Sequence, residues 1–393
     1  MFLQTYQVPF FVSYFDNIPE NKNHIFYQLF SLDLYFDEKT GLVHQHINEE
    51  KQRLLDNIYK QGSIIYQSFD DDEYEEGEHL QKRKNQFLEL FFSIFSENEI
   101  KGKDILEIGC GPGYLLNEFK KRGANVIGCD PGPFQSLALN KFGIEIIPDY
   151  FSDNTFMNKR FDIIISYAFL TGINDPLTTL IQMKNLLKKK GKVLTAVADY
   201  TPHLELGNIF CITPEQVNYF TQKAIKNLYL KAGLGNIQIL NSSYGSGMQI
   251  LGDNSSQNEF PDNEADIQEL KMQAQDFKEK ANVCINKLQD RINKSTIKSL
   301  GIMGANIETV NLLHYIDFKE IKIYLYEYDK TFINKYLPSV EIPISHEENI
   351  IDDSPNEIWC VPIAFADKIE KKLIELFGVN ASLLNMRTFL KSL

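Results

Sequence analysis

The sequence predicts an α/β protein whose central part is a parallel sheet buried on both faces. Short apolar runs alternate with amphipathic stretches, and the runs read DILEIG, ANVIGCD, IEIIPD, FDIIISYA, GKVLTAVAD and NIQILNSS. Strands that are apolar along their whole length, with helices between them, are typical of parallel sheets covered on both sides. A helical pattern at 81–95 precedes the first run, so we expect the central α/β domain at residues 81–250.

A smaller lobe is expected before this domain, at residues 1–80. Residues 1–69 are rich in aromatic side chains and short apolar runs, with a turn signal at Lys39-Thr40-Gly41. This pattern predicts a mostly β or mixed structure. The acidic stretch DDDEYEEGE at 70–78 then indicates a solvated surface connector.

Two further segments follow the central domain. A polar linker at 252–263 leads into a predicted helix at 264–294, and together they form a connecting segment at 251–294. Residues 295–393 repeat the alternation as strand, helix, strand, strand and predict a second, smaller α/β domain. Apolar residues spaced by threes and fours form one stripe on the helix, suited to packing between domains or to dimerisation. The stripe consists of Ile267, Leu270, Ala274, Phe277, Ala281, Ile285, Leu288 and Ile292.

Composition limits the partners of this chain. Its 393 residues fit two or three domains, and its formal net charge of −13 disfavours a nucleic-acid partner. The run 188–190 of three lysines lies beside a predicted turn and is interpreted as solvated charge. Five scattered cysteines without a C-x-x-C pair indicate reduced thiols. No signal peptide or membrane-length apolar run is recognised, so we expect a cytoplasmic protein without membrane contact, as a monomer or homodimer.

The strongest motif is DILEIGCGPGYLL at 104–116. A buried strand carries Glu107 near its end, and Gly109, Gly111 and Gly113 then form a tight turn into a helix. Glycine permits backbone angles that a Cβ forbids and lets a ligand lie against the main chain. The spacing is G-x-G-x-G, whereas the dinucleotide fingerprint is G-x-G-x-x-G.

Acidic residues follow the next two strands in order. Asp130 ends the second strand, where its carboxylate can accept hydrogen bonds from ribose hydroxyls. Asp149 follows the third strand, placed to meet an adenine amino group, and Ser166 and Tyr167 end the fourth strand. Residues 103–198 resemble the cofactor half of class I S-adenosylmethionine (SAM) dependent methyltransferases, with a NAD-type site as the alternative. The resemblance implies a cofactor site made of Glu107, Gly109, Cys110, Gly111, Gly113, Tyr114, Asp130, Pro131, Asp149, Tyr150, Ser166 and Tyr167.

The whole chain also resembles the nucleotide-sugar C-methyltransferases of deoxysugar biosynthesis. These enzymes have an N-terminal zinc lobe, a central SAM domain and a C-terminal Rossmann-like domain that helps to hold the sugar nucleotide. The matching stretches are TGLVHQ at 40–45, PEQVNYFT at 214–221, and GAN at 304–306 with the strand and helix residues after it. The resemblance implies a SAM-binding Rossmann-like domain between a small N-terminal lobe and a Rossmann-like α/β domain that holds substrate.

The sequence departs from this family at its metal and acid–base positions. No cysteine precedes Cys110, so a four-cysteine zinc site cannot form, and His44 and His46 are interpreted as surface residues rather than metal ligands. The Glu-His pair of the family is represented by Glu215 and Gln216. The family histidine after the fourth strand is absent from 169–173, and Tyr244 stands at the position of another.

These observations and the resemblance predict a SAM-dependent methyltransferase that acts on a small molecule, a nucleotide-linked sugar of carbohydrate biosynthesis. Glu215 is the candidate base, or an acidic residue that stabilises a helix start. Tyr219, Tyr244 and Tyr167 are candidate positioning or proton-relay groups, or packing residues. Two alternatives stay open: O- or N-methylation of a small metabolite, and a non-catalytic SAM-binding scaffold.

Overall fold

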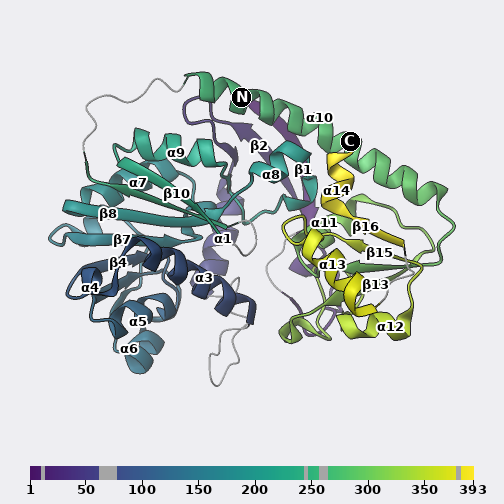
Figure 1. Ribbon diagram of the computed structural model, residues 1–393, viewed down its shortest axis with the longest axis horizontal. Coiled ribbons are helices and arrows are strands. Elements are labelled where there is room, and N and C mark those ends of the chain that lie inside the picture. The colour runs from purple at the N-terminus through teal and green to yellow at the C-terminus, as the bar shows by residue number, and fades with distance from the viewer. Residues whose placement is uncertain (10–13, 62–77, 243–246, 256–263, 378–381) are drawn as a thin grey trace.

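The protein has three sheets joined by a long helix (Figure 1). The computed structural model describes residues 1–9, 14–61, 78–242, 247–255, 264–377 and 382–393. In Figure 1 the helix α10 (Glu264–Lys294) runs along one side of the molecule, from the central domain to the C-terminal domain. Among the helices of these residues, none combines the length and apolar character needed to cross a bilayer.

The N-terminal sheet has four antiparallel strands in the order β1-β2-β3-β9. Its last strand comes from the central domain, because Val43 pairs with Tyr219 and His44 with Asn218. A helix, α1, leaves this sheet toward the central domain. The bounds are β1 (Phe2–Pro9), η1 (Ile25–Tyr27), β2 (Leu29–Phe36), β3 (Val43–Gln45), α1 (Glu49–Gln61) and β9 (Asn218–Tyr219).

The central sheet confirms the predicted α/β fold class. Its seven strands have the order β10-β11-β8-β7-β4-β5-β6, and β6, β5, β4, β7 and β8 are parallel. Strand β11 is antiparallel to β8 and lies outside the predicted strands. The bounds are β4 (Asp104–Ile108), β5 (Asn125–Cys129), β6 (Ile146–Ile147), β7 (Phe161–Tyr167), β8 (Leu187–Ala198), β10 (Gly235–Asn241) and β11 (Gly247–Asp253).

Helices cover both faces of this sheet, which explains why its strands are apolar throughout. Phe87, Phe91 and Phe119 pack on one face with Ile163 and Ile165. The opposite face is covered by helices α7 and α9 through residues such as Leu180 and Leu228. The helices are α3 (Glu78–Ile94), α4 (Glu97–Ile100), α5 (Tyr114–Lys121), α6 (Gln135–Phe142), η2 (Asp153–Phe156), η3 (Phe169–Gly172), α7 (Pro176–Asn185), α8 (Thr201–Leu206), η4 (Ile209–Cys211) and α9 (Gln222–Lys231).

The C-terminal domain is a second parallel α/β unit. Its five strands have the order β14-β13-β12-β15-β16 and all pair in parallel. The predicted strand, helix, strand, strand correspond to β12, α11, β13 and β15, whereas β14, β16 and the later helices lie outside that prediction. The bounds are β12 (Ser299–Met303), α11 (Ile307–Tyr315), β13 (Lys322–Glu327), η5 (Lys330–Phe332), β14 (Ile344–His346), η6 (Glu347–Asn349), α12 (Ile350–Asp353), β15 (Glu357–Cys360), α13 (Ala366–Phe377), β16 (Ser382–Asn385) and α14 (Met386–Lys391).

Helix α10 uses its apolar stripe inside the chain. Leu270, Ala274 and Phe277 are buried in one cluster with side chains of the N-terminal sheet and of the C-terminal domain. Ile267 and Ile285 are partly buried against the same cluster. The stripe therefore packs the three parts of the chain together, which is the first of its two predicted uses.

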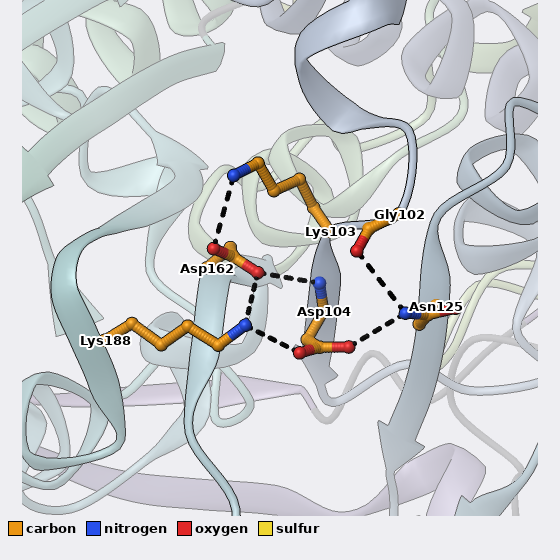
Figure 2. Close-up of polar contacts among 6 residues, drawn as sticks. All are labelled: Gly102, Lys103, Asp104, Asn125, Asp162 and Lys188. Carbon is orange, nitrogen blue, oxygen red and sulfur yellow. Dashed lines mark hydrogen bonds and ion pairs between the residues drawn. The ribbon is translucent and has the colours of Figure 1, made fainter.

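The lysines at 188–190 correct one expectation. They lie in β8, where Lys189 and Lys190 are exposed as expected, whereas Lys188 Nζ donates to Asp104 Oδ2 and Asp162 Oδ2 at 2.7 Å each. Figure 2 shows this network at the amino ends of β4 and β7, where Lys103 also approaches Asp162 and Asn125 donates to Asp104. Lys188 is therefore a structural residue that neutralises two neighbouring carboxylates, at the edge opposite to the glycine turn.

Candidate functional site

The glycine turn joins β4 to α5 with backbone angles that only glycine tolerates well. Gly109, Gly111 and Gly113 have φ of 71°, 48° and 81°. A Cβ on Gly109 would lie 3.0 Å from Cβ of Phe169. The main chain therefore passes close to the segment after β7, at the carboxyl edge of the sheet where ligands of open α/β folds bind.

Asp130 is fixed beside this turn. Its Oδ2 accepts from the Gly111 amide and its Oδ1 from the Gly132 amide, at 2.8 Å each. Burial raises the pKa of Asp130, against the effect of these two hydrogen bonds. Each carboxylate oxygen has lone pairs left over. The side chain can therefore hold the turn and still accept from two hydroxyl groups of a ligand.

Glu107 is the second carboxylate of the site. It is 3% exposed, and its Oε2 is buried without a hydrogen-bond partner in the described part of the chain. Burial raises the pKa of Glu107, and the negative charge of Asp130 adds to this rise. A buried acceptor without a donor is unfavourable by about 1–3 kcal/mol. A ligand bearing an ammonium or hydroxyl group would satisfy it, so these residues fit SAM.

The remaining predicted cofactor residues lie along the same edge. Asp149 is exposed after β6, and its carboxylate accepts from the Tyr150 amide at 2.7 Å. The Tyr150 hydroxyl donates to Asp56 of α1 at 3.0 Å, so the N-terminal lobe reaches this edge. Ser166 is fully buried, and its hydroxyl has no hydrogen-bond partner among the described residues. Cys110 is buried, and Tyr114, Pro131 and Tyr167 are partly buried.

A cavity of about 230 Å³ lies beside the carboxyl ends of β7 and β8. Helix α3 covers it with Arg83 and Phe87, and Tyr167 and Gln216 line its inner side. A second cavity of about 190 Å³ lies between the central and C-terminal domains and is lined by Arg387 of α14. Ser242 and Gly247 line both cavities, so the two adjoin.

The candidate base Glu215 lies on the α1 side of η3. Its Oε2 accepts from the Thr213 hydroxyl, and its Oε1 is buried without a hydrogen-bond partner among the described residues. Burial raises the pKa of Glu215 to about 8, against the hydrogen bond from Thr213 and the positive charge of Lys51. The neighbouring Gln216 lines the first cavity instead.

The candidate tyrosines differ in their surroundings. Tyr219 is fully buried, and its hydroxyl accepts from Gln45 Nε2 at 2.8 Å. Tyr167 lines the first cavity and packs edge-on against Phe87. Tyr244 lies outside the described residues.

Several residues of the site were not predicted from the sequence. Lys51, Arg83 and Arg387 come from three different helices, and no local pattern connects them with the glycine turn. Of the two histidines weighed as metal ligands in the N-terminal lobe, His46 is exposed and His44 is half-buried beside Tyr35. Among the described residues, no group of three or more histidine, cysteine or acidic side chains is arranged to hold a metal ion.

Comparison with known proteins identifies two domains. Residues 77–239 match the methyltransferase domain family, and residues 256–384 match the C-methyltransferase C-terminal domain family. The ubiquinone biosynthesis O-methyltransferase of Dinoroseobacter shibae is 32% identical over 113 residues, or 27% of this chain and 46% of that protein. The tRNA U34 carboxymethyltransferase of Hydrogenovibrio crunogenus is 32% identical over 108 residues, or 25% of this chain and 32% of that protein. This chain thus spans less than half the length of these curated relatives.

Among solved structures, the magnesium protoporphyrin IX methyltransferase of Synechocystis PCC 6803 with bound S-adenosylhomocysteine (SAH) is similar to this chain. Its TM-score is 0.41 at 12% identity, and the match covers 52% of this chain and all of that one.

The class of protein follows from three observations: the fold, the glycine turn with its two carboxylates, and the family matches. Residues 77–239 form a methyltransferase domain by this match, and the methyl donor of such a domain, SAM, is the cofactor predicted from the sequence. More particularly, this domain is followed by a C-methyltransferase C-terminal domain.

Proposed function

We propose that this protein transfers the methyl group of SAM to a small anionic acceptor, a nucleotide-linked sugar. The observation that carries this proposal is the pair of adjoining cavities that runs from the ends of β7 and β8 to the C-terminal domain. SAM would be held by Glu107, Asp130 and the glycine turn, and supplies an activated methyl group. Direct displacement at that methyl group depends mainly on positioning the acceptor, so a shaped cavity beside the cofactor site accounts for much of the rate.

The size of the cavities supports an extended acceptor. At about 230 and 190 Å³, each one alone is smaller than the roughly 300–1,000 Å³ of common ligand sites. A ligand that passes Ser242 and Gly247 would occupy both and reach that range. A sugar ring joined to a second group fits such a site better than a single compact molecule does.

Charge supports an anionic group in the acceptor. Each cavity is lined by one arginine, Arg83 in the first and Arg387 in the second, on a chain with a net charge of −13. The acidic residue of the second cavity, Asp199, already accepts from the Thr201 amide and from Gln222 at 2.9 Å each. Guanidinium groups bind phosphate and carboxylate groups in two-pronged geometry.

Glu215 is the proposed proton acceptor of the reaction. Methylation of carbon beside a keto group requires removal of a proton from carbon, and a base with a pKa near the working pH performs this best. Burial gives Glu215 a pKa of about 8. The other side chains proposed to act are Tyr167 and Tyr219, as positioning groups, together with Tyr244.

O-methylation is the second candidate. The relative from Dinoroseobacter shibae is named an O-methyltransferase. An acceptor oxygen is itself nucleophilic and needs only modest help from a base, which suits a site with Gln216 in place of the family histidine.

Incubation with methyl-labelled SAM and a panel of nucleotide sugars, followed by mass spectrometry and NMR of the product, tests these readings. A labelled methyl group bonded to a carbon of the sugar ring is expected. A labelled methyl group bonded to oxygen would replace the proposal with the second candidate, and SAM binding without any transfer would indicate a non-catalytic scaffold.

A further inference from the structure

We propose that Lys51, contributed by the N-terminal helix α1, is a positioning residue for methyl transfer that holds the segment 213–219, which carries Glu215 and Gln216, at the wall of the first cavity. This inference rests on the function proposed above. It gives the N-terminal lobe a part in the reaction, through the segment that Lys51 and Gln45 hold.

The first step is a hydrogen-bond chain from Lys51 to the segment. Lys51 is 7% exposed, and its ammonium donates to Oε1 of Gln45. Gln45 Nε2 lies 2.5 Å from the carbonyl of Thr213, 2.7 Å from that of Gln216 and 2.8 Å from the Tyr219 hydroxyl. A lysine can only donate, so it fixes the amide of Gln45 with its oxygen toward α1 and its nitrogen toward the segment.

The second step is the continuity of the backbone. Strand β3 of the N-terminal lobe pairs with β9, and the Gln45 amide donates to the carbonyl of Val217 at 2.8 Å. The Val217 amide in turn donates to the carbonyl of Thr171 at 2.8 Å. Thr171 and Gln216 both line the first cavity. The N-terminal lobe is therefore joined to the wall of the proposed acceptor site through short hydrogen bonds.

The third step is electrostatic. Burial raises the pKa of Glu215, and the hydrogen bond from Thr213 and the positive charge of Lys51 lower it in part. Burial lowers the pKa of Lys51 itself to about 8. Without the ammonium, the pKa of the buried carboxyl group would rise further, and a smaller fraction of it would be ionised at neutral pH. The other titratable groups that face this pair are Asp33 on β2, Asp56 and Tyr59 on α1, and Tyr219 on β9.

The test compares pH profiles of transfer for Lys51→Gln, Lys51→Arg and the wild type. Lys51→Gln keeps a donor for Gln45 but removes the charge, so the acidic limb of the kcat profile should move up by about one pH unit. At neutral pH the rate should then fall about tenfold, because the ionised fraction of Glu215 falls by that factor. Lys51→Arg should restore the wild-type limb.

The matched control is Arg53→Gln, which removes an exposed positive charge from the same helix. It should leave the profile unchanged. SAM affinity, measured by calorimetry, should be the same in all variants, because the cofactor residues are untouched. If Lys51→Gln does not fold, Lys51→Met fills the buried space without a charge and carries the same expectation.

The outcomes separate this inference from the proposed function. If the wild type transfers methyl groups and the neutral Lys51 variants keep its pH profile and kcat, Lys51 has only a structural role and the inference is wrong. If the wild type binds SAM and transfers no methyl group to any acceptor, the proposed function itself fails.

Discussion

Replacing Asp130 with alanine is the most direct test of the cofactor site. The carboxylate of Asp130 accepts from the Gly111 and Gly132 amides and holds the glycine turn against the end of β5. Asp130→Ala leaves both amides without this acceptor and removes the oxygens proposed to meet the ribose hydroxyls. SAM binding should weaken, because the turn and the ribose lose the same anchor.

The magnitude follows from the type of hydrogen bond. A hydrogen bond to a charged group contributes about 1.5–3 kcal/mol, and Asp130 is partly buried, so solvent replaces it poorly. Loss of the ribose contact alone should therefore raise the Kd for SAM by about 10- to 150-fold. In the free protein the effect on stability should be smaller, because burial already disfavours the charge of Asp130.

The matched variant is Asp130→Asn. Its side-chain oxygen can still accept from one amide, while its NH2 group faces the other donor, so an intermediate affinity is expected. Calorimetric titration with SAM and with SAH measures both variants. A Kd equal to that of the wild type for Asp130→Ala would refute the assignment of Asp130 to the ribose.

Three further changes test other parts of the structure. Glu215→Gln should leave SAM affinity intact while turnover with the acceptor falls about 100-fold or more, and wild-type turnover would exclude Glu215 as the base. Arg387→Gln should raise the acceptor KM about tenfold at an unchanged Kd for SAM, whereas an unchanged KM would exclude this arginine as the anion contact. Lys188→Met should lower the free energy of unfolding in urea by about 1 kcal/mol at pH 7, a value kept small by partial exposure of the pair. The hydrogen bond from Lys188 lowers the pKa of Asp104, and it does the same for Asp162 against burial, so this contribution should vanish as the pH falls below about 4. Equal stability of variant and wild type at pH 7 would contradict it.

The backbone around the glycine turn was predictable from local sequence. The strand β4, the turn with its three glycines and the start of α5 are consecutive in the chain, so the backbone constraint and the residue pattern coincide. The bounds of α10 and the buried stripe on it were predictable for the same reason, since a helix repeats its contacts every three to four residues.

The acceptor half was not predictable in this way. Lys51, Gln45 and Glu215 are brought together by the pairing of β3 with β9, which are more than 160 residues apart in the chain. Strand β9 has two residues, too few for a periodic pattern in the sequence. The prediction that Lys188 is solvated was wrong, because Asp104 and Asp162 on neighbouring strands accept hydrogen bonds from it. Such partners are distant in sequence, and charged residues near a turn are usually solvated. Strand β11 was missed because it pairs antiparallel with β10 and β8, outside the strand–helix alternation from which the parallel strands were predicted.

Strand β9, which the central domain contributes to the N-terminal sheet, limits which fragments of this protein can fold. A fragment that begins at residue 77, where the methyltransferase match begins, lacks β3. Asn218 and Tyr219 would then lose their pairing with His44 and Val43, and the edge of β9 would be left unpaired. This truncation would also uncover Tyr219, which is fully buried in the whole chain. A catalytic fragment should therefore begin at the first residue of β1, and shorter fragments should aggregate.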